Sequence, residues 1–581
     1  MSTPDTFDRT GSPAPMPRYS FLLLLGLLAC STPEKGRDQE AAGGKFYGGV
    51  FNMNEGDDDL GSLFPLSLTR SSAHHIASQV YEGLVAFDQR DLSIRPGLAE
   101  SWTVDQSRTV YTFKLRAGVR FHDDTCFADG TGRELTATDV VESLTALCTH
   151  DASNQMFWLF QDKVLGANAH YAATVGGKAG PGVSGLEAID QLTVRVTLTT
   201  PYPSFLQILA HQGCWIHPKE LVAHYGSEAR WHPVGTGPFR LKHFVRGEVI
   251  VLERWPYYWG KDAQGNQLPF LDAIKCTFLK DKEQEFEQFA KGNLSMIDEL
   301  PVERTVEMND TAAYQVQTIS GLSVQFYGFD HRHPPFNDVR LRRAISLAID
   351  RRMIVDSILN GLAIPARHGV VAPGFAAYPY DSVPALEYDP TEAAALLAEA
   401  GHPGGAGIPT IFLQVNGDGF GYIRVAEAVQ EMLTKNLGLR VVTTVLPADQ
   451  HYKRIEMGHA QLWREGWVVD HPDPENFLAL FYGKNVPADT AQPSYLNSTR
   501  YKDATYDSLF ARALRTPEQA ERMMILGRAE RHLMEDMVVA PLYHERSVRM
   551  LQPWVRDLPI NGMELRQIRD TWFDPAARSA K

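Results

Sequence analysis

Histidine clusters are the first feature of this chain that suggests chemistry, because neutral imidazole is a common metal ligand. The chain contains 19 histidines, and two clusters stand out, His74-His75 and His331-Arg332-His333. Neighbouring side chains on a strand point to opposite faces, and no two histidines have the four-residue spacing that places both on one face of a helix. We therefore predict structural or solvent-exposed histidines, no metal site and no cofactor.

A glycine-rich turn, Gly417-Asp418-Gly419-Phe420-Gly421, is the second such feature. It lies between a predicted strand (410–415) and a predicted helix (423–436), where dinucleotide-binding loops are found. The last glycine of that motif would fall at Tyr422, and no acidic residue closes the next predicted strand, 439–446. We therefore predict an ordinary turn within a βαβ unit, which makes at least one part of the protein α/β.

The cysteines divide into Cys30 and four others, Cys126, Cys148, Cys214 and Cys276, whose wide spacing fits no zinc motif. In an oxidising compartment, four cysteines allow three pairings. Cys126 lies in a loop rich in Gly and Asp, and Cys148 ends a predicted helix just beyond it. This is the disulfide that we would test first, and four unpaired thiols are the alternative.

An apolar run at residues 19–29 precedes Cys30. It is too short to span a bilayer, which takes about 20 apolar residues, and has the length of a signal-peptide core. Leu28-Ala29-Cys30 resembles the bacterial lipobox, in which the cysteine is lipidated and becomes the mature N-terminus. An ordinary signal peptide is the alternative, and Met16 is an alternative start. We predict an exported protein anchored to a membrane through Cys30.

The bulk composition restricts the class of protein. About 550 residues follow Cys30, which is more than one hydrophobic core supports, so we expect two or more domains. The formal charge of −14 argues against nucleic-acid binding. No later apolar stretch approaches the length of a membrane span.

Local patterns predict several elements that would hold any site. Residues 110–115 and 192–198 alternate apolar and polar side chains, as half-buried strands do. Asp389-Pro390 opens a helix that ends before Gly401, with a capping residue, an N-terminal proline and a terminal glycine. Thr516-Pro517-Glu518-Gln519 has the pattern of a capping box and predicts a further helix towards Met537.

Several longer blocks, taken in order, resemble the family 5 extracellular solute-binding proteins, the peptide, dipeptide and nickel receptors of ABC importers. The blocks are Pro96-Gly-Leu-Ala-Glu-Ser-Trp102, Tyr111 to His122, Val234-Gly-Thr-Gly-Pro-Phe239, Leu252 to Gly260, Pro335 to Ile345, Tyr388-Asp-Pro390 and Gly466 to Phe477. The resemblance covers essentially all of residues 46–560.

This resemblance implies an α/β, two-lobed periplasmic-binding-protein fold, class II-like and of cluster C, with an extra small domain. Two chain crossings, near 323–330 and 541–549, would serve as hinge strands. The implied organisation is a lipoprotein signal peptide at 1–30, a flexible tether at 31–45, lobe I at 46–80, 190–321 and 535–575, domain II at 81–189, and lobe III at 322–534.

The resemblance also implies the ligand-binding residues. In the peptide-binding branch, the acidic residue of a Trp-x-x-Asp motif pairs with the ammonium group of the ligand, and Trp467 and Asp470 match it. A turn-capping role for Asp470 is the alternative. The backbone of Gly466 and Val468 would pair with a peptide as an added strand does. Further candidate contacts are Ser71, Ser72, His74, Phe157 and Trp158. Ordinary packing is the alternative for Phe157 and Trp158, and a place in the core is the alternative for Trp467.

We therefore predict a monomeric substrate-binding protein that captures oligopeptides or dipeptides between two lobes and delivers them to an inner-membrane ABC permease. It is not expected to be an enzyme, because no nucleophile elbow, metal motif or phosphate loop is present. The alternatives are the same class with a nickel chelate, a sugar oligomer or another small solute, an exported hydrolase, and a ligand-sensing lipoprotein. Ser31 after Cys30 also leaves outer-membrane sorting open.

Overall fold

The computed structural model of the chain describes residues 39–56, 59–298, 313–417, 421–489 and 491–579. The predicted signal peptide and Cys30 lie outside these residues. Within them, no helix combines the length and the apolar character that crossing a bilayer requires.

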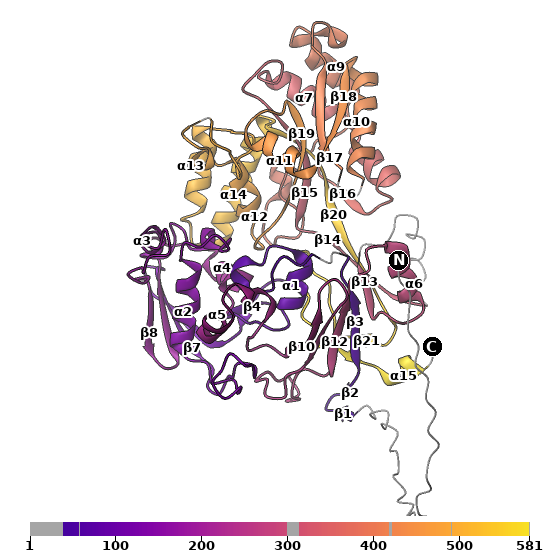
Figure 1. Cartoon of the computed structure of the whole chain (residues 1–581). Coiled ribbons are helices and arrows are strands. Elements are labelled where there is room, and N and C mark those ends of the chain that lie inside the picture. Colours follow the sequence, from indigo (N-terminus) through magenta and orange to yellow (C-terminus); the bar gives the residue numbers. More distant parts are fainter. Residues whose placement is uncertain (1–38, 57–58, 299–312, 418–420, 490, 580–581) are drawn as a thin grey trace, which may run out of the picture. The chain divides into compact units, whose positions relative to one another are not determined.

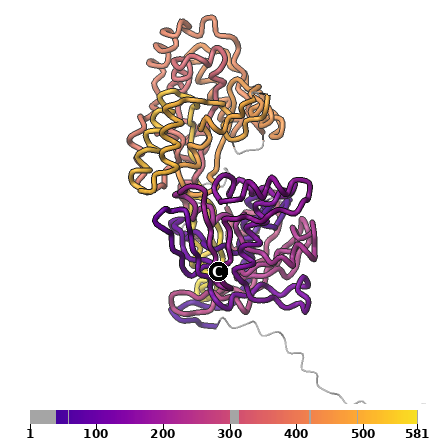
Figure 2. Tube along the Cα trace, turned by 90° about the vertical axis from the view of Figure 1, so that its left-hand side faces the viewer, coloured from indigo at the N-terminus to yellow at the C-terminus, as the bar shows by residue number. Residues whose placement is uncertain are grey.

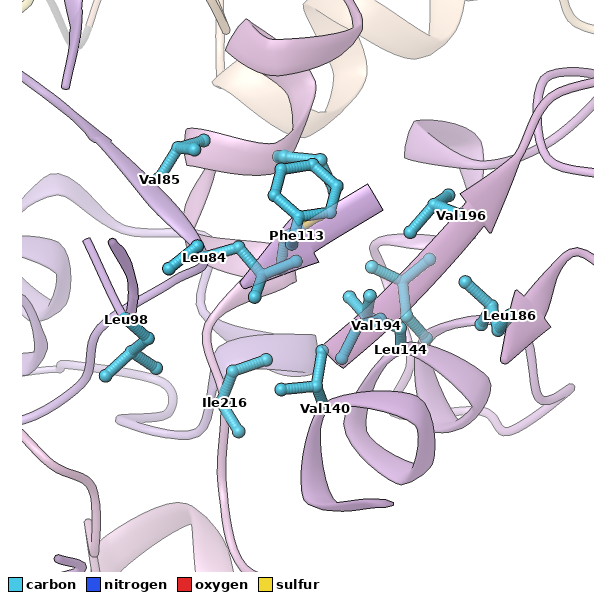
Figure 3. Close-up of a cluster of buried hydrophobic side chains, with 14 of the residues drawn as sticks. Leu84, Val85, Leu98, Phe113, Val140, Leu144, Leu186, Val194, Val196 and Ile216 are labelled. Atoms are coloured by element: carbon cyan, nitrogen blue, oxygen red, sulfur yellow. The ribbon is translucent and has the colours of Figure 1, made fainter. Parts of the chain in front are cut away.

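An antiparallel sheet with the strand order β6-β7-β9-β8 carries the first hydrophobic core. Its strands are β6 (Ala99–Val104), β7 (Val110–Leu115), β9 (Thr193–Thr197) and β8 (Leu186–Asp190). The predicted strands at 110–115 and 192–198 are confirmed as β7 and β9. Alternate residues such as Phe113 and Val194 point inward and pack with Leu144 of α2 (Ala137–Leu147), as Figure 3 shows.

The segment after β9 packs into the same core. It forms α4 (Phe205–Ala210), which buries Phe205 and Ile208. The neighbouring short elements are β4 (Val85–Phe87), β5 (Ile94–Pro96), α3 (Ala167–Ala173) and α5 (Lys219–Tyr225).

A second sheet, in the order β10-β11-β12-β3, supports another core. Its strands are β10 (Phe239–Val245), β11 (Val249–Arg254), β12 (Ala273–Thr277) and β3 (Val50–Asn54), and the pair β12–β3 is parallel. The helix α1 (Ser71–Ala77) packs on it through Ala73 and Ile76. The helix α6 (Lys282–Ala290) follows β12.

The largest sheet in the described residues follows the order β13-β20-β15-β19-β17-β18, and β14 and β16 also pair with β20. These strands are β13 (Met296–Asp298), β14 (Gln315–Ser320), β15 (Ser323–Phe329), β16 (Ala363–Pro365), β17 (Ile411–Asn416), β18 (Val441–Leu446), β19 (Leu462–Val468) and β20 (Val539–Leu551). Every residue of β15 is buried, because Tyr327 and Phe329 enter one core while Val324 and Phe326 enter another.

Helices cover both faces of this sheet. One core includes the helices α7 (Val339–Leu347), α8 (Arg351–Met353), α9 (Pro390–Glu399) and α10 (Tyr422–Leu437), and the other includes α12 (Pro474–Leu478), α13 (Ala504–Ala513) and α14 (Gln519–Glu535). The helix α11 (Ala448–Glu456) lies between β18 and β19. Figure 1 shows α9 and α10 beside β17 and β18. The predicted βαβ unit is confirmed, because β17 and β18 are parallel neighbours joined by α10.

The two predicted helix starts have different outcomes. The Asp389 side chain caps α9, accepting hydrogen bonds from the Thr391 and Glu392 backbone N–H groups at 3.0 and 2.9 Å. The predicted capping box at Thr516 is wrong. The Thr516 hydroxyl donates instead to the Arg512 carbonyl at 2.9 Å, so it satisfies the end of α13, and α14 begins at Gln519.

The chain path returns to its beginning through β20. In Figure 2 the C-terminus lies among the indigo and purple N-terminal elements, although α14, which precedes β20, lies with the orange ones. The strands β15 and β20 coincide with the two predicted hinge crossings and pair with each other. The last residues of the predicted tether form β1 (Gln39–Ala41), which pairs with β2 (Lys45–Tyr47). The chain closes with β21 (Val555–Arg556), β22 (Trp572–Phe573) and α15 (Pro575–Ser579).

Candidate functional site

The C-terminal half of β19 presents an open strand edge. Along one edge β19 pairs with β15 over its whole length, from Leu462 opposite Phe329 to Val468 opposite Ser323. Along the other edge it pairs with β17 only at Leu462 and Trp463. In the described part of the chain, the edge beyond Trp463 therefore has no strand partner. Val468 at its end is 60% exposed.

Asp470 follows this strand and is anchored by one amide. The Asn476 side chain donates to the Asp470 carboxylate at 3.3 Å, and its oxygen accepts from the Asp470 backbone N–H at 3.2 Å. The same oxygen accepts from the Trp467 indole N–H at 2.7 Å. Asn476 thus fixes both residues of the Trp-x-x-Asp motif. The Trp467 ring also packs against the core that contains α12 and α14, so it has a structural role as well.

The Asp470 carboxylate has no cationic partner among the described salt bridges. Burial raises its pKa, and the neighbouring His471 and the Asn476 hydrogen bond offset part of that rise. A half-buried carboxylate of this kind is stabilised by any cation that reaches it.

A cavity of about 60 Å³ lies against Asp470. Its other walls come from residues distant in sequence, including Glu82 and Arg95 near β4 and β5, His211 after α4, and His74 on α1. Sites for small ligands usually measure about 300–1,000 Å³. The enclosed space is therefore smaller than a typical ligand site.

Two histidines in this wall are held neutral. Burial lowers the pKa of His74 to about 3, and the nearby His75 and Arg566 add to the shift. Burial also lowers the pKa of His211 to about 3, with contributions from His74 and His471. The His211 Nδ1 atom accepts from the Gly213 backbone N–H at 3.2 Å.

The structure brings together only some of the predicted ligand contacts. His74 and Asp470 line the same cavity. Trp158 meets His211 edge to face, with ring centroids 5.5 Å apart. Ser71 is exposed at the start of α1, and Ser72 is buried. Phe157 stacks on Tyr171 at 3.8 Å within the first core, which is the packing alternative.

Arg464 is a candidate that the sequence analysis missed. It lies on β19 two residues before Gly466 and is only 5% exposed. Its guanidinium donates to Asn416 at 3.1 Å, to Tyr452 at 3.2 Å and to Gln325, all neutral acceptors. Its Nε atom has no hydrogen-bond partner, and no carboxylate lies within salt-bridge distance of Arg464 in the described residues. The only signal in the sequence was a charged residue inside a predicted strand of lobe III.

The remaining predictions fall away from the cavity. Cys126 and Cys148 are free thiols in the structure, so the pairing considered from the sequence is not formed there. Burial raises the pKa of Cys148 to about 12, as expected for a thiol inside an apolar core.

Among the described residues, one group could hold a metal ion, and it consists of Asp503, His532 and Asp536 near α13 and α14. Asp503 also caps α13, and Asp536 accepts from the Tyr501 hydroxyl at 2.5 Å.

The cavity is lined by acidic and basic side chains from segments that lie far apart in the sequence, an arrangement typical of proteins that bind a small solute between two lobes. The sequence model of a protein family, the bacterial extracellular solute-binding proteins, family 5, matches residues 93–489 of this chain. The chain therefore belongs to this family, which confirms the resemblance.

Two curated relatives and one solved structure illustrate the similarity. The periplasmic oligopeptide-binding protein OppA of Escherichia coli K12 is 27% identical over 511 residues, covering 86% of this chain and 87% of the relative. The glutathione-binding protein GsiB of Escherichia coli O1:K1 is 27% identical over 495 residues, covering 84% and 87%. The Helicobacter pylori periplasmic binding protein DppA in complex with the peptide STSA matches with a TM-score of 0.73 at 23% identity, covering 91% of this chain and 98% of that one. The predicted periplasmic-binding-protein fold is confirmed by this last match.

Proposed function

We propose that this protein is the peptide-binding component of an ABC importer. The observation that carries the proposal is Asp470, a carboxylate that has no cationic partner among the residues that the structure describes and that lies at the end of an open strand edge and against a cavity. An ammonium group removed from water needs an ionised acceptor at contact distance. The N-terminus of a peptide supplies such an ammonium group.

The strand edge explains how peptides of many different sequences can bind at one site. The backbone of β19 around Gly466 and Val468 can pair with a peptide main chain, which is the same in every sequence. Arg464, on the same strand, is buried and held by neutral acceptors, so its positive charge would attract the ligand's carboxylate without contacting it in this arrangement. The relatives named for oligopeptides and glutathione support ligands that carry both an ammonium and a carboxylate group.

The remaining features of the proposal concern delivery. The protein acts as a monomer outside the cytoplasm, held to the membrane through a lipid on Cys30, and passes its ligand to a membrane permease. It carries out no chemical reaction on the ligand, because delivery requires reversible capture. Ligand shifts the protein between open and closed states by its differential affinity for them.

Native mass spectrometry of residues 31–581, purified from the host, tests the proposal. We expect mass increments that denaturation releases as a ladder of short peptides. A metal chelate or a sugar released in their place would contradict peptide binding and favour another solute. An empty protein that no peptide of two to five residues stabilises against heat would also contradict it.

A further inference from the structure

A buried charge cluster joins the starts of α12 and α14. The Arg522 guanidinium donates to the two Asp473 oxygens at 2.6 and 2.8 Å and to Glu475 at 2.7 Å. Arg522 is 2% exposed, Asp473 4% and Glu475 6%, so all three charges are removed from water. Two carboxylates against one guanidinium leave an excess negative charge, which requires further hydrogen-bond donors in a buried setting.

These donors come from the far side of the cavity. The Ser204 hydroxyl, which opens α4, lies 3.2 Å from both Asp473 Oδ2 and Glu475 Oε2, and it accepts from Arg522 Nη2 at 3.2 Å. The Tyr202 hydroxyl donates to Glu475 Oε1. The Lys163 ammonium lies 5.5 Å from the centroid of the Tyr202 ring and adds a positive charge. Ser204 and Asp473 are 269 residues apart in the sequence.

The same two segments carry the ligand-binding side chains. His211, at the end of α4, lines the cavity, and Asp470, three residues before Asp473, lies opposite it. Between them, the Gln207 side chain donates to the Pro472 carbonyl at 3.3 Å. A force that holds α4 against 470–475 therefore also holds the two walls of the site together.

We propose that Tyr202 and Ser204, with the Arg522–Asp473–Glu475 cluster, form a latch that keeps the ligand-binding walls in their closed arrangement. The inference rests on the proposed function and extends it to residues that touch no ligand. Tyr202 and Ser204 are positioning residues. When the walls separate, both hydroxyls and the surplus carboxylate are exposed to water. The latch therefore favours the closed state by the free-energy difference between the hydrogen bonds within the cluster and those with water.

Titration with trialanine, measured by calorimetry, tests the latch in Tyr202→Phe, Ser204→Ala and the double variant. Each hydroxyl donates to a buried carboxylate, so we expect each single variant to bind about tenfold more weakly. The melting temperature of the ligand-free protein should stay unchanged. Arg522 is left in place, because removing it would strand two buried carboxylates and endanger folding.

Tyr225→Phe is the matched control. The Tyr225 hydroxyl also donates to a carboxylate, that of Asp124 at 2.9 Å, and the described hydrogen bonds of these two side chains reach neither α4 nor residues 470–475. This variant should bind trialanine like the unmodified protein.

A mutant cycle with Asp470→Asn separates positioning from a general structural role. If the latch acts by holding Asp470 in place, Tyr202→Phe should cost much less affinity when Asp470 is already altered. Full additivity would overturn the inference. Unchanged affinity in the Tyr202 and Ser204 variants, or a melting-temperature loss that parallels the affinity loss, would also overturn it.

Small-angle scattering distinguishes failure of the latch from failure of the proposed function. If the unmodified protein binds no alanine peptide of two to five residues, peptide binding is refuted and the latch is judged from the ligand-free proteins alone. We expect a larger radius of gyration in the Tyr202→Phe/Ser204→Ala double variant. Equal radii would overturn the latch.

Discussion

At the scale of single residues, the proposed recognition of the ligand depends most on Asp470. Its side chain receives one side-chain hydrogen bond in the described structure, from Asn476, and faces a cavity rather than a cation. Replacing Asp470 with Ala should cost about 2–5 kcal/mol of peptide affinity, because the ligand's ammonium would then be buried without a counter-charge. Calorimetric titration of the identified peptide measures this loss.

Asp470→Asn is the matched variant for that experiment. It preserves the shape of the side chain, removes the charge and replaces one acceptor oxygen with an NH2 donor. We expect most of the affinity loss to persist in Asp470→Asn. Binding equal to that of the unmodified protein would show that the site recognises a neutral donor instead of an ammonium group.

Glu530 is a second buried carboxylate, with a role in stability. It is fully buried on α14, accepts from the Val370 and Val371 backbone N–H groups at 2.7 and 2.8 Å, and from the Tyr378 hydroxyl at 2.6 Å. Burial outweighs these bonds and raises the pKa of Glu530 to about 7. Its pKa is higher in the folded than in the unfolded chain, so the stability it contributes is present below pH 4.5 and is lost as the pH rises through 7.

Glu530→Gln should therefore raise the free energy of unfolding at pH 8 by about 1–3 kcal/mol and change it little at pH 5. Urea unfolding at the two pH values measures the difference. The control is Glu535→Gln on the same helix, whose side chain is 50% exposed. An equal effect of Glu530→Gln at both pH values would contradict the argument.

At the scale of elements, the close packing of β19 on β15 explains the glycine beside the motif. A Cβ atom on Gly466 would lie 2.4 Å from the Gln325 side-chain oxygen. Gln325 cannot move freely, because it is 4% exposed and bonds both Arg464 and Glu545. Gly466→Ala should lower the free energy of unfolding by about 1–3 kcal/mol, which urea denaturation measures.

Gly417→Ala is the control for this element. A Cβ atom there would meet only the Val445 side chain at 3.5 Å, an ordinary contact, so we expect little change in stability. The double variant Gly466→Ala/Gln325→Ala should recover part of the loss, because the obstructing oxygen is gone. If the double variant recovered none of the lost stability, the strain would come from another contact of the strand.

The elements also show what sequence patterns can and cannot predict. The strands β7 and β9 and the unit β17-α10-β18 followed from local periodicity, since each buries one face of a short segment. The start of α14 did not follow, because the Thr516 hydroxyl has a competing acceptor in the preceding helix.

The predicted contacts that line the cavity, Asp470 and His74, came from the family resemblance, and the better defined of the two belongs to a motif that is continuous in sequence. Asp470 and Trp467 belong to such a motif, and their shared partner Asn476 lies close behind them. Arg464 was missed because nothing in its neighbours reveals that its acceptors are all neutral. The latch was missed because Ser204 meets Asp473 across 269 residues.

At the scale of the whole molecule, two imidazoles from distant segments, those of His74 and His211, predict that closure depends on pH. His74 faces His75 and Arg566, and His211 faces His74 and His471. Their pKa values of about 3 lie below the ordinary 6.5, so protonation opposes this arrangement. The closed state is fully stable above about pH 6.5 and loses stability as the pH falls below it.

Peptide affinity should accordingly be constant above pH 7 and fall by about tenfold to a hundredfold between pH 7 and pH 5. The raised pKa of Asp470 adds to this fall, because its protonation removes the charge that attracts the ligand. The double variant His74→Gln/His211→Gln should retain only the Asp470 contribution. Titrations at pH 5, 6 and 7.5 give the profile, and an unchanged profile in the variant would exclude the histidines.

The placement of the latch on the segments that bear the ligand contacts has an evolutionary consequence. Residues 470–475 carry both the carboxylate proposed to recognise the ligand and the carboxylates of the proposed latch, and the segment from Ser204 to His211 likewise carries a latch hydroxyl and a cavity-lining side chain. Substitutions at Tyr202 or Ser204 can therefore change ligand affinity in small steps while the ligand contacts are conserved. Gene duplicates of this protein could diverge into high- and low-affinity scavengers of one nutrient class, each suited to a different external concentration.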